Sequence, residues 1–293
     1  MDNLESIILE LKKRNARRIF VQYPEGLVTK ILEISRKLEE NGFDVVISME
    51  PCYGACDIRD FEAERLGCDI ILHIGHLDFG LKTKLPVVYW EYMMEVNPIP
   101  TLEKEFQKLE PYKKIGLLTS LQYVRAIEKV KEYLKKRGKE VFIHKTLKYP
   151  GQVLGCCVYS AEAIEEMVDC FLFVGSGLFH PLSVAMKVEK PVLSLDLEKN
   201  SILDLEEERK KWLKRKAWHE SKLKDARRVG ILVSWKIGQN RIEEALKFKD
   251  ELLREGKEVF ILVFDRIDLD KLDALKLDCH VNMACPRLDF DVL

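Results

Sequence analysis

The sequence predicts an α/β protein of three homologous domains, each a small parallel sheet flanked by helices. Two observations carry this prediction. A basic pair, an apolar run, a helical pattern, a glycine and a second apolar run recur in that order, starting near residues 17, 113 and 227. Each copy also holds a cysteine-bearing stretch. Because this period is much longer than that of a solenoid repeat, we interpret the copies as domains.

The first copy spans residues 1–100 in our division of the chain. Its elements are indicated by β-rich runs, by apolar residues at helical spacing and by breaks at Pro or Gly. We expect a strand, a helix, a strand, a helix and two further strands at residues 17–23, 27–41, 43–49, 61–67, 70–74 and 87–90. The first cysteine stretch directly follows the second of these strands.

The second copy spans residues 101–200 and repeats this order. Its expected strand, helix and three further strands lie at residues 113–120, 122–137, 139–144, 171–177 and 191–195. The third copy spans residues 201–293 and begins with a charge-dense segment, which we interpret as a solvated connecting helix. The connecting helix, a strand, a helix and two strands are expected at residues 204–228, 227–234, 241–255, 257–263 and 280–283.

Strands that alternate with helices imply crossover connections and a parallel sheet in each copy. In open α/β sheets, ligand sites collect at the carboxyl ends of the strands. The three cysteine stretches, at residues 51–57, 151–157 and 283–287, each follow such a strand. We therefore expect the fold to bring one cysteine from each stretch to a common point.

Composition narrows the class of protein. Lys plus Arg (48) nearly balances Asp plus Glu (49), which argues against nucleic acid or an anionic membrane as a partner. No segment approaches the roughly 18 consecutive apolar residues that would cross a bilayer. The polar N-terminus, Met1–Ser6, lacks the pattern of a signal peptide, so we expect a cytoplasmic protein. In a reducing cytoplasm its eight cysteines should be thiols or metal ligands rather than disulfides.

The cysteines form two groups. Cys68, Cys170 and Cys279 lie at the starts of strands, at positions that look equivalent, and we expect them to fill the core. The other five lie in the cysteine stretches: Cys52, Cys56, Cys156, Cys157 and Cys285. These stretches contain Gly, Pro or Ala, which let a backbone approach a bulky ligand, and they lack the CxxC pairs of a zinc ribbon. One thiolate from each stretch, with no fourth ligand, indicates a [4Fe-4S] cluster with one iron open to a substrate.

Three motifs resemble those of the archaeal diphthamide synthase family, the 2-(3-amino-3-carboxypropyl)histidine synthases. They are Tyr-Gly-Ala-Cys at 53–56, Gly-Gln-Val-Leu-Gly-Cys at 151–156 and Cys-Pro-Arg at 285–287. The resemblance covers essentially the whole chain. One departure is that family members usually continue beyond the Cys-Pro-Arg motif, whereas this sequence ends at Leu293.

The resemblance implies three related domains arranged with pseudo-threefold symmetry around a central [4Fe-4S] cluster. Its motifs place the cluster ligands at Cys56, Cys156 and Cys285. Cys52 and Cys157 then become neighbours of ligands rather than ligands. The resemblance also implies a homodimer.

The activity implied by the resemblance is a radical transfer in the first step of diphthamide biosynthesis. In the family, S-adenosylmethionine binds at the open iron and one electron from the reduced cluster breaks its Cγ–S bond. The resulting 3-amino-3-carboxypropyl group is added to C2 of a histidine in elongation factor 2. An electron donor is therefore a further expected partner.

We expect contacts to S-adenosylmethionine after the first strand of each copy, where backbone N–H groups can hold a carboxylate, and beside the last ligand cysteine. The candidates are Glu25, Ser120, Ser234, Gln239 and Arg287. We assign no catalytic role to the histidines that follow the third strands, His73, His76 and His180.

Two rival functions are compatible with the architecture that the sequence predicts. Quinolinate synthase is also a three-domain enzyme with one cluster cysteine per domain, and it uses its open iron as a Lewis acid for dehydration. Only the motifs favour diphthamide synthase over it. The other rival is a small-molecule sensor or binding module built from periplasmic-binding-like units, which would hold no iron.

Overall fold

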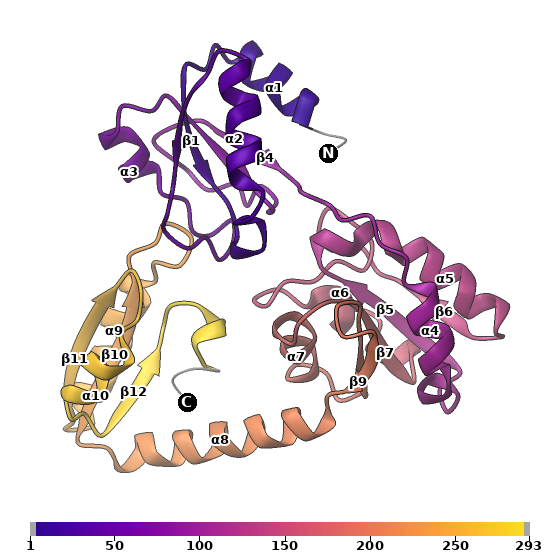
Figure 1. The fold of residues 1–293 in the computed structure, drawn as a ribbon. Helices are drawn as coiled ribbons and strands as arrows, with labels where there is room; N and C mark the ends of the chain where they lie inside the picture. Colours follow the sequence, from indigo (N-terminus) through magenta and orange to yellow (C-terminus); the bar gives the residue numbers. More distant parts are fainter. Residues whose placement is uncertain (1–3, 290–293) are drawn as a thin grey trace. The chain divides into compact units, whose positions relative to one another are not determined.

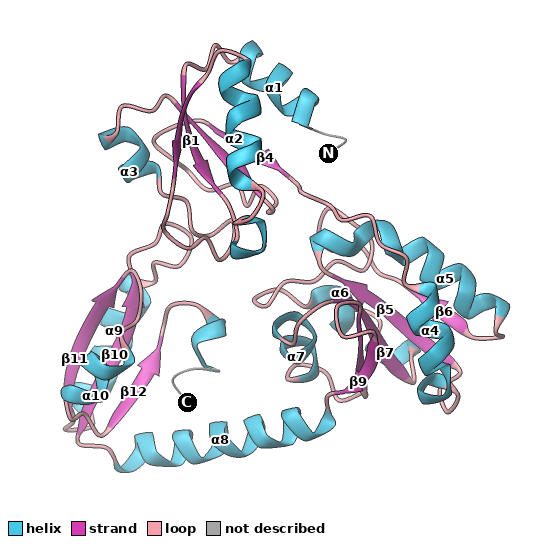
Figure 2. Cartoon of the chain, in the orientation of Figure 1, coloured by secondary structure: helices cyan, strands magenta, loops and turns pink. Residues whose placement is uncertain are grey.

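The computed structural model describes residues 4–289 and shows an α/β fold whose sheets are flanked by helices (Figure 1). The described chain divides into two compact units. The first consists of the chain up to Tyr92 together with Trp235–Asn240, and the second contains the remainder. Figure 2 shows the strands of the sheets, with helices beside them and loops at their ends.

The first unit is built on a four-stranded parallel sheet with the strand order β2-β1-β3-β4. Its helices and strands are α1 (Leu4–Lys13), β1 (Arg18–Gln22), α2 (Ile31–Glu40), β2 (Asp44–Ile47), α3 (Asp60–Arg65), β3 (Ile70–Ile74) and β4 (Val87–Trp90). A short 3-10 turn, Glu25–Leu27, precedes α2, which begins at Ile31 rather than at residue 27 as predicted. The parallel sheet expected in the first copy is confirmed.

Two apolar layers cover the faces of this sheet. Ile19 and Val21 of β1 pack with residues of α1 and α2 on one face, whereas Phe20 packs with Ile58 and Ala63 on the other face, where α3 lies (Figure 1). This alternation follows from the two-residue period of a strand. Both faces are therefore buried, which explains the continuous apolar run of β1.

The second sheet has five strands in the order β6-β5-β7-β8-β9. The elements in this part of the chain are α4 (Ile99–Glu105), β5 (Lys114–Thr119), α5 (Ile127–Lys136), β6 (Glu140–Phe142), α6 (Tyr159–Glu162), β7 (Cys170–Gly175), α7 (Phe179–Ala185), β8 (Val192–Asp196) and β9 (Ser201–Asp204). The first four strands are parallel, as expected, but β9 is antiparallel to β8. Strand β9 was not predicted, because its short segment runs directly into the charge-dense region interpreted as the connecting helix.

The third sheet has three parallel strands in the order β11-β10-β12. The elements are α8 (Glu206–Asp225), β10 (Arg228–Ser234), α9 (Ile242–Arg254), β11 (Glu258–Phe264), α10 (Leu269–Ala274) and β12 (Cys279–Asn282). Helix α8 is the connecting helix expected from the charge-dense segment, and none of its residues is buried. All three sheets thus share the same central arrangement, in which the first strand lies between the second and the third.

An aspartate carboxylate binds the start of the first strand in each of the three sheets. Asp69, Asp169 and Asp278 each accept hydrogen bonds from two backbone N–H groups of the basic pair that begins the first strand. The position of the neighbouring cysteine is less regular. Cys170 and Cys279 occupy the same register position, but Ile70 holds it in the first sheet, so the expected equivalence of Cys68 is wrong. The expectation that these three cysteines are buried is confirmed.

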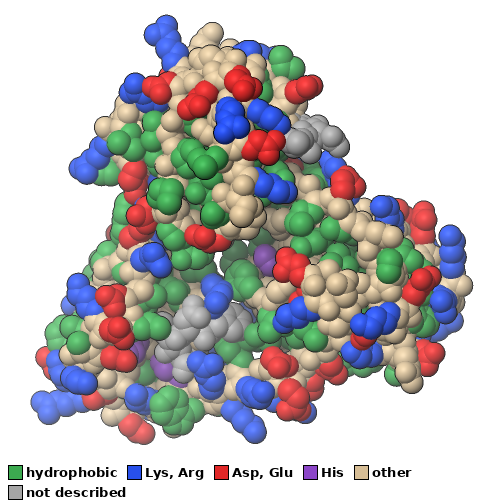
Figure 3. Space-filling view, in the orientation of Figure 1, with side chains coloured by type: hydrophobic (Ala, Val, Ile, Leu, Met, Phe, Trp, Pro, Cys, Tyr) green, Lys and Arg blue, Asp and Glu red, His purple; other side chains and the backbone are tan. Residues whose placement is uncertain are grey.

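Acidic and basic side chains are interspersed over the face shown in Figure 3, in line with the nearly balanced charge. Within residues 4–289, no helix combines the length and apolar character needed to cross a membrane.

Candidate functional site

The loop that carries Cys56 begins after β2 and is fixed to the sheet by Gln22, the last residue of β1. The completely buried Gln22 side chain donates to the backbone oxygen of Asp57 at 3.0 Å and accepts from the backbone N–H of Arg59 at 3.0 Å. One amide therefore holds two points of the loop just after Cys56. The Asp57 carbonyl and the Arg59 N–H thus both have hydrogen-bond partners, which stabilises the irregular backbone of this buried segment.

The segment that follows β10 in the chain packs against the same loop. The N–H of Gly238 donates to the backbone oxygen of Cys56 at 3.0 Å. A Cβ on Gly238 would lie 2.5 Å from the Cα of Cys56, so only glycine permits this approach. The ammonium of Lys236 lies 2.6 Å from the carboxylate of Asp57, and both side chains are buried. The Lys236 ammonium also lies 5.6 Å from the centroid of the Tyr53 ring.

The two cysteines of this loop differ in environment. The Cys56 thiol is partly exposed and accepts a hydrogen bond from the Gln239 side-chain amide at 3.3 Å. Burial raises the pKa of Cys56, and the Gln239 hydrogen bond opposes that rise. Cys52 is buried, and its sulfur lies 3.8 Å from Nε2 of His73. Burial raises the pKa of Cys52 to about 12.

Cys156 lies at the tip of a tight turn. Leu154 and Cys157 exchange backbone hydrogen bonds of 2.9 and 3.2 Å, which leaves Gly155 and Cys156 between them. Cys156 is exposed, whereas Cys157 is half-buried. A Cβ on Gly155 would overlap the ring of Phe179, the first residue of α7, so glycine is required under this ring. The turn therefore presents the Cys156 side of the pair outward.

Asn282, the last residue of β12, organises the loop of Cys285. Its side-chain amide donates to the backbone oxygen of Cys285 at 2.8 Å and to the carboxylate of Asp289 at 2.7 Å. Its side-chain oxygen accepts from the N–H of Ala284 at 2.9 Å. Asn282 thus fixes the backbone of this loop by hydrogen bonds from its side-chain amide, as Gln22 fixes the loop of Cys56.

Arg287, two residues beyond Cys285, stacks near a ring that also borders the Cys156 turn. Its guanidinium lies 5.7 Å from the centroid of the Phe179 ring, the same ring that covers Gly155. This is a cation–π distance. Within the second unit, Phe179 therefore contacts both the Cys156 turn and the residue that follows the Cys285 loop.

The other residues predicted to contact S-adenosylmethionine lie at strand ends as expected. Ser234 ends β10 and is completely buried. Ser120 directly follows β5 and precedes the 3-10 turn Leu121–Ala126, and it is also buried. Glu25 is exposed at the start of the turn after β1. Their proposed contacts to the ligand stay predictions.

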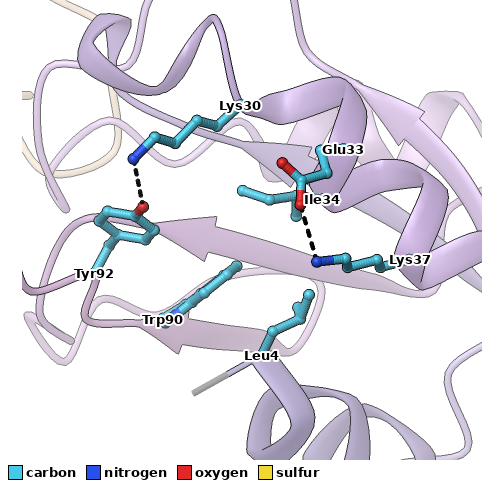
Figure 4. Close-up of a pocket in the computed structure, with 7 residues that line it drawn as sticks. All are labelled: Leu4, Lys30, Glu33, Ile34, Lys37, Trp90 and Tyr92. Atoms are coloured by element: carbon cyan, nitrogen blue, oxygen red, sulfur yellow. Dashed lines mark hydrogen bonds and ion pairs between the residues drawn. The ribbon is translucent and has the colours of Figure 1, made fainter. Parts of the chain in front are cut away.

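A small, mostly apolar pocket in the first unit is lined by none of the residues predicted for the site (Figure 4). Its lining residues are Leu4, Lys30, Glu33, Ile34, Lys37, Trp90 and Tyr92. Figure 4 shows Lys30 reaching Tyr92 and Lys37 reaching Glu33, at 3.1 and 2.9 Å. These polar lining side chains are paired with one another, so we assign the pocket no catalytic part.

The residues that hold the cysteine loops were not predicted from the sequence. Lys236 and Asp57 are 179 positions apart, and no local pattern reports such a pair. Gln22 and Asn282 did carry a signal, because each is an amide residue that directly follows apolar residues at the end of a strand. A polar residue at that position needs a partner beyond the sheet.

The chemistry of the described cysteine loops, each taken by itself, is compatible with ligands of an iron–sulfur cluster. All eight cysteines lie within residues 4–289, and no disulfide pairs them there. Cys56 is half-buried, presents its sulfur beside glycine-rich backbone and accepts an N–H···S hydrogen bond, which is a feature of cluster-binding thiolates.

Comparison with known proteins gives one consistent result. A family model described as "Putative diphthamide synthesis protein" matches residues 23–292. The chain is 34% identical to the 2-(3-amino-3-carboxypropyl)histidine synthase of Pyrococcus horikoshii, covering 97% of this chain and 83% of that protein. It is 31% identical to the Methanocaldococcus jannaschii protein of the same name, covering 97% and 81%. The crystal structure of Pyrococcus horikoshii Dph2 with a 4Fe-4S cluster matches with a TM-score of 0.88 at 32% identity, covering 98% of this chain and 85% of that one.

Proposed function

Since the chain belongs to the diphthamide synthesis protein family, we propose that it is a 2-(3-amino-3-carboxypropyl)histidine synthase, the enzyme of the first step of diphthamide biosynthesis. The observation that carries this proposal is the match over nearly the whole chain to a relative of that name and to a solved structure with a 4Fe-4S cluster. A shared fold alone would not assign the reaction, but identity at this level over nearly the whole chain supports a shared site.

The cofactor of the proposed reaction is a [4Fe-4S] cluster held by Cys56, Cys156 and Cys285. Two observations support this ligand set. Cys56 and Cys156 are each more exposed than their neighbours Cys52 and Cys157. The loops of Cys56 and Cys285 are each fixed by a side-chain amide at a strand end. When bound, the cluster supplies the electron that breaks the Cγ–S bond of S-adenosylmethionine.

The protein's own residues orient the reactants. Gln239 donates to the Cys56 sulfur and thereby stabilises its thiolate form. The ion pair of Lys236 with Asp57 fixes the loop that carries this sulfur. Arg287 offers a guanidinium next to a ligand cysteine, where it can pair with the carboxylate of S-adenosylmethionine. Because the orientation of the sulfonium decides which of its bonds breaks, these contacts determine the product.

We also propose a domain arrangement for the chain. The common strand order of the three sheets supports three homologous domains, with boundaries at residues 1–100, 101–200 and 201–293 and pseudo-threefold symmetry about the cluster. The repeated carboxylates at the strand starts support it as well. The expected partners are elongation factor 2 as the protein substrate, an electron donor and a second copy of the chain in a homodimer. A substrate that works in translation places the enzyme in the cytoplasm.

Product analysis under anaerobic conditions tests the proposal. The cluster-loaded protein is reduced with dithionite and incubated with S-adenosylmethionine and archaeal elongation factor 2. We expect 5′-methylthioadenosine, and a histidine of the factor that gains the mass of a 3-amino-3-carboxypropyl group. Formation of 5′-deoxyadenosine would contradict the proposed bond cleavage. If an iron-loaded protein forms neither 5′-methylthioadenosine nor 5′-deoxyadenosine, Lewis-acid chemistry of the quinolinate synthase kind is favoured.

A further inference from the structure

Cys52, His73 and His76 form a cluster of side chains that the proposed reaction does not use. The sulfur of Cys52 lies 3.8 Å from Nε2 of His73, and that nitrogen lies 3.0 Å from Nδ1 of His76. One ligand atom from each residue lies within 4.8 Å of the other two. We propose that these three residues bind one zinc ion, at a site separate from the iron–sulfur cluster.

The spacing of the donor atoms fits this ion. Tetrahedral zinc with Zn–S near 2.3 Å and Zn–N near 2.05 Å separates sulfur from nitrogen by about 3.6 Å and two nitrogens by about 3.3 Å. The Cys52–His73 and His73–His76 separations differ from these values by a few tenths of an ångström, and all three ligand atoms lie within 4.8 Å of one another. A thiolate with two imidazoles is a ligand set that zinc favours. Three protein ligands leave the fourth position to water, on the side of the half-buried His76.

The backbone is arranged to bring the two imidazoles together. His73 lies in β3 on the same face as Ile71, and its ring packs edge-on against Tyr89 at 5.5 Å between centroids. Gly75 adopts a φ of 89°, in the left-handed region, and a Cβ there would lie 2.9 Å from Pro24. Glycine at this position therefore lets the chain turn so that the ring of His76 faces the ring of His73.

Hydrogen bonds satisfy only one of the two ring nitrogens of His73, the Nε2 that faces Cys52 and His76. The side chain is completely buried, and among the described residues its Nδ1 has no hydrogen-bond partner. Burial and the neighbouring His76 lower the pKa of His73 to about 3, so its imidazole is neutral and keeps a lone pair for a metal. A bound cation would also displace the thiol proton of Cys52, whose burial otherwise keeps it protonated.

The site would have a structural consequence for the cysteine loop. Cys52 lies four positions before Cys56 in the same loop, whereas His73 lies in the central part of the sheet. Zinc would therefore join the beginning of this loop to β3, just as Gln22 joins its end to β1. The buried thiol of Cys52 would then bind zinc, and the more exposed thiol of Cys56 would bind the cluster.

Metal analysis of the full-length, cluster-loaded protein tests this proposal without relying on activity. After anaerobic dialysis against zinc chloride and then against metal-free buffer, zinc and iron are counted by mass spectrometry. We expect about one zinc per chain, with one sulfur near 2.3 Å and two nitrogens near 2.0 Å in the zinc X-ray absorption spectrum. That spectrum is specific to zinc, so the iron sites do not interfere.

Single variants assign the ligands. In Cys52→Ser and His76→Asn we expect zinc affinity to fall by about tenfold or more, with iron unchanged. His76→Asn is the safer variant for folding because this side chain is only half-buried. Cys68→Ser and His144→Asn are the matched controls, and they should keep zinc. Cys156→Ala should lose iron and keep zinc.

Three results would overturn the proposal. They are less than about one tenth of an equivalent of zinc, a zinc shell with two or more sulfurs, and undiminished zinc in both Cys52→Ser and His76→Asn. Loss of iron rather than zinc in Cys52→Ser would make Cys52 a cluster ligand instead. The proposed synthase activity is judged by its nucleoside product, so either proposal can fail while the other stands.

Discussion

Cys56 and Gln239 are 183 positions apart in the chain, yet the amide of one contacts the sulfur of the other. At the scale of single residues, such long-range contacts set the environment of a candidate ligand. The motif identifies which cysteine resembles a ligand, but the hydrogen bond is what can adjust the electron affinity of a cluster.

Replacing Gln239 by leucine should lower the midpoint potential of the cluster. In the unmodified protein the N–H···S bond stabilises the reduced cluster more than the oxidised one, because the reduced cluster is more negative. If the bond contributes about 1 kcal/mol to this difference, its loss lowers the potential by roughly 40 mV for one electron. Potentiometric titration followed by electron paramagnetic resonance measures it. Gln107→Leu, at an exposed position, is the control. An unchanged potential in Gln239→Leu would show that the amide serves the substrate or the fold instead.

Replacing Lys236 by methionine should destabilise the protein strongly. Asp57 would keep a buried charge without its partner, which costs about 3–5 kcal/mol. The control is Lys84→Met, because the pair of Lys84 with Glu64 is half-exposed and worth at most about 1 kcal/mol. Chemical denaturation of both variants gives the comparison. Equal losses of stability would mean that the buried pair adds nothing beyond an ordinary surface pair.

At the scale of elements, the strands were the most predictable part of the chain. Residues 70–74 and 87–90 were predicted with the bounds that β3 and β4 have, because each is a short, mostly apolar run of residues that favour strands. Helices α4, α7 and α10 were not predicted. They have only six or seven residues, a length at which a helical period is weak, although α3 is equally short and was predicted. The contacts of Lys236 and Gln239 with the Cys56 loop join residues 179 and 183 positions apart, so no local pattern predicts them.

The carboxylates at the strand starts should make stability depend on acid. Hydrogen bonds from backbone N–H groups lower the pKa of Asp169 and of Asp278. Their stabilisation is therefore present above the unfolded pKa near 3.9 and is lost as the pH falls through the lower, folded pKa. In melting curves between about pH 2 and 5, Asp169→Asn should flatten the acid decline. Asp250→Asn, at an exposed position on α9, should leave it unaltered, and equal curves for the two variants would contradict this assignment.

The turn that presents Cys156 should not tolerate a side chain at Gly155. An added Cβ overlaps the Phe179 ring, so Gly155→Ala should reduce iron retention and cost about 1–3 kcal/mol of stability. Phe179→Ala in the same protein should restore part of both, because it removes the obstacle. Gly26→Ala, where a Cβ meets no atom within 4 Å, should be neutral. Full iron in Gly155→Ala would show that the turn does not position the ligand.

At the scale of the whole molecule, repetition in the sequence was enough to predict the sheets and the positions of the cysteine stretches at their ends. Three copies of one order of strands and helices predicted the α/β class and the parallel sheets. The expectation that the cysteine stretches follow equivalent strands is wrong for the third copy, because Cys56 and Cys156 follow the second strand of their copies whereas Cys285 follows β12, the counterpart of β3 and β7. The antiparallel β9 and the buried partners of the Cys56 loop could not be predicted in this way. Within residues 4–289, strand β9 has no counterpart in the other two copies. The partners of the Cys56 loop come from a segment far away in the chain, which a repeat does not encode.

The central claim is that one cysteine from each stretch holds the cluster and that its neighbours do not. The most direct measurement is the iron content of five anaerobically purified variants, together with the paramagnetic signal of the reduced protein. Cys56→Ala, Cys156→Ala and Cys285→Ala should each lose most of the about four irons per chain, while Cys52→Ala and Cys157→Ala keep them. Retention of the cluster in Cys56→Ala together with its loss in Cys52→Ala would contradict the account.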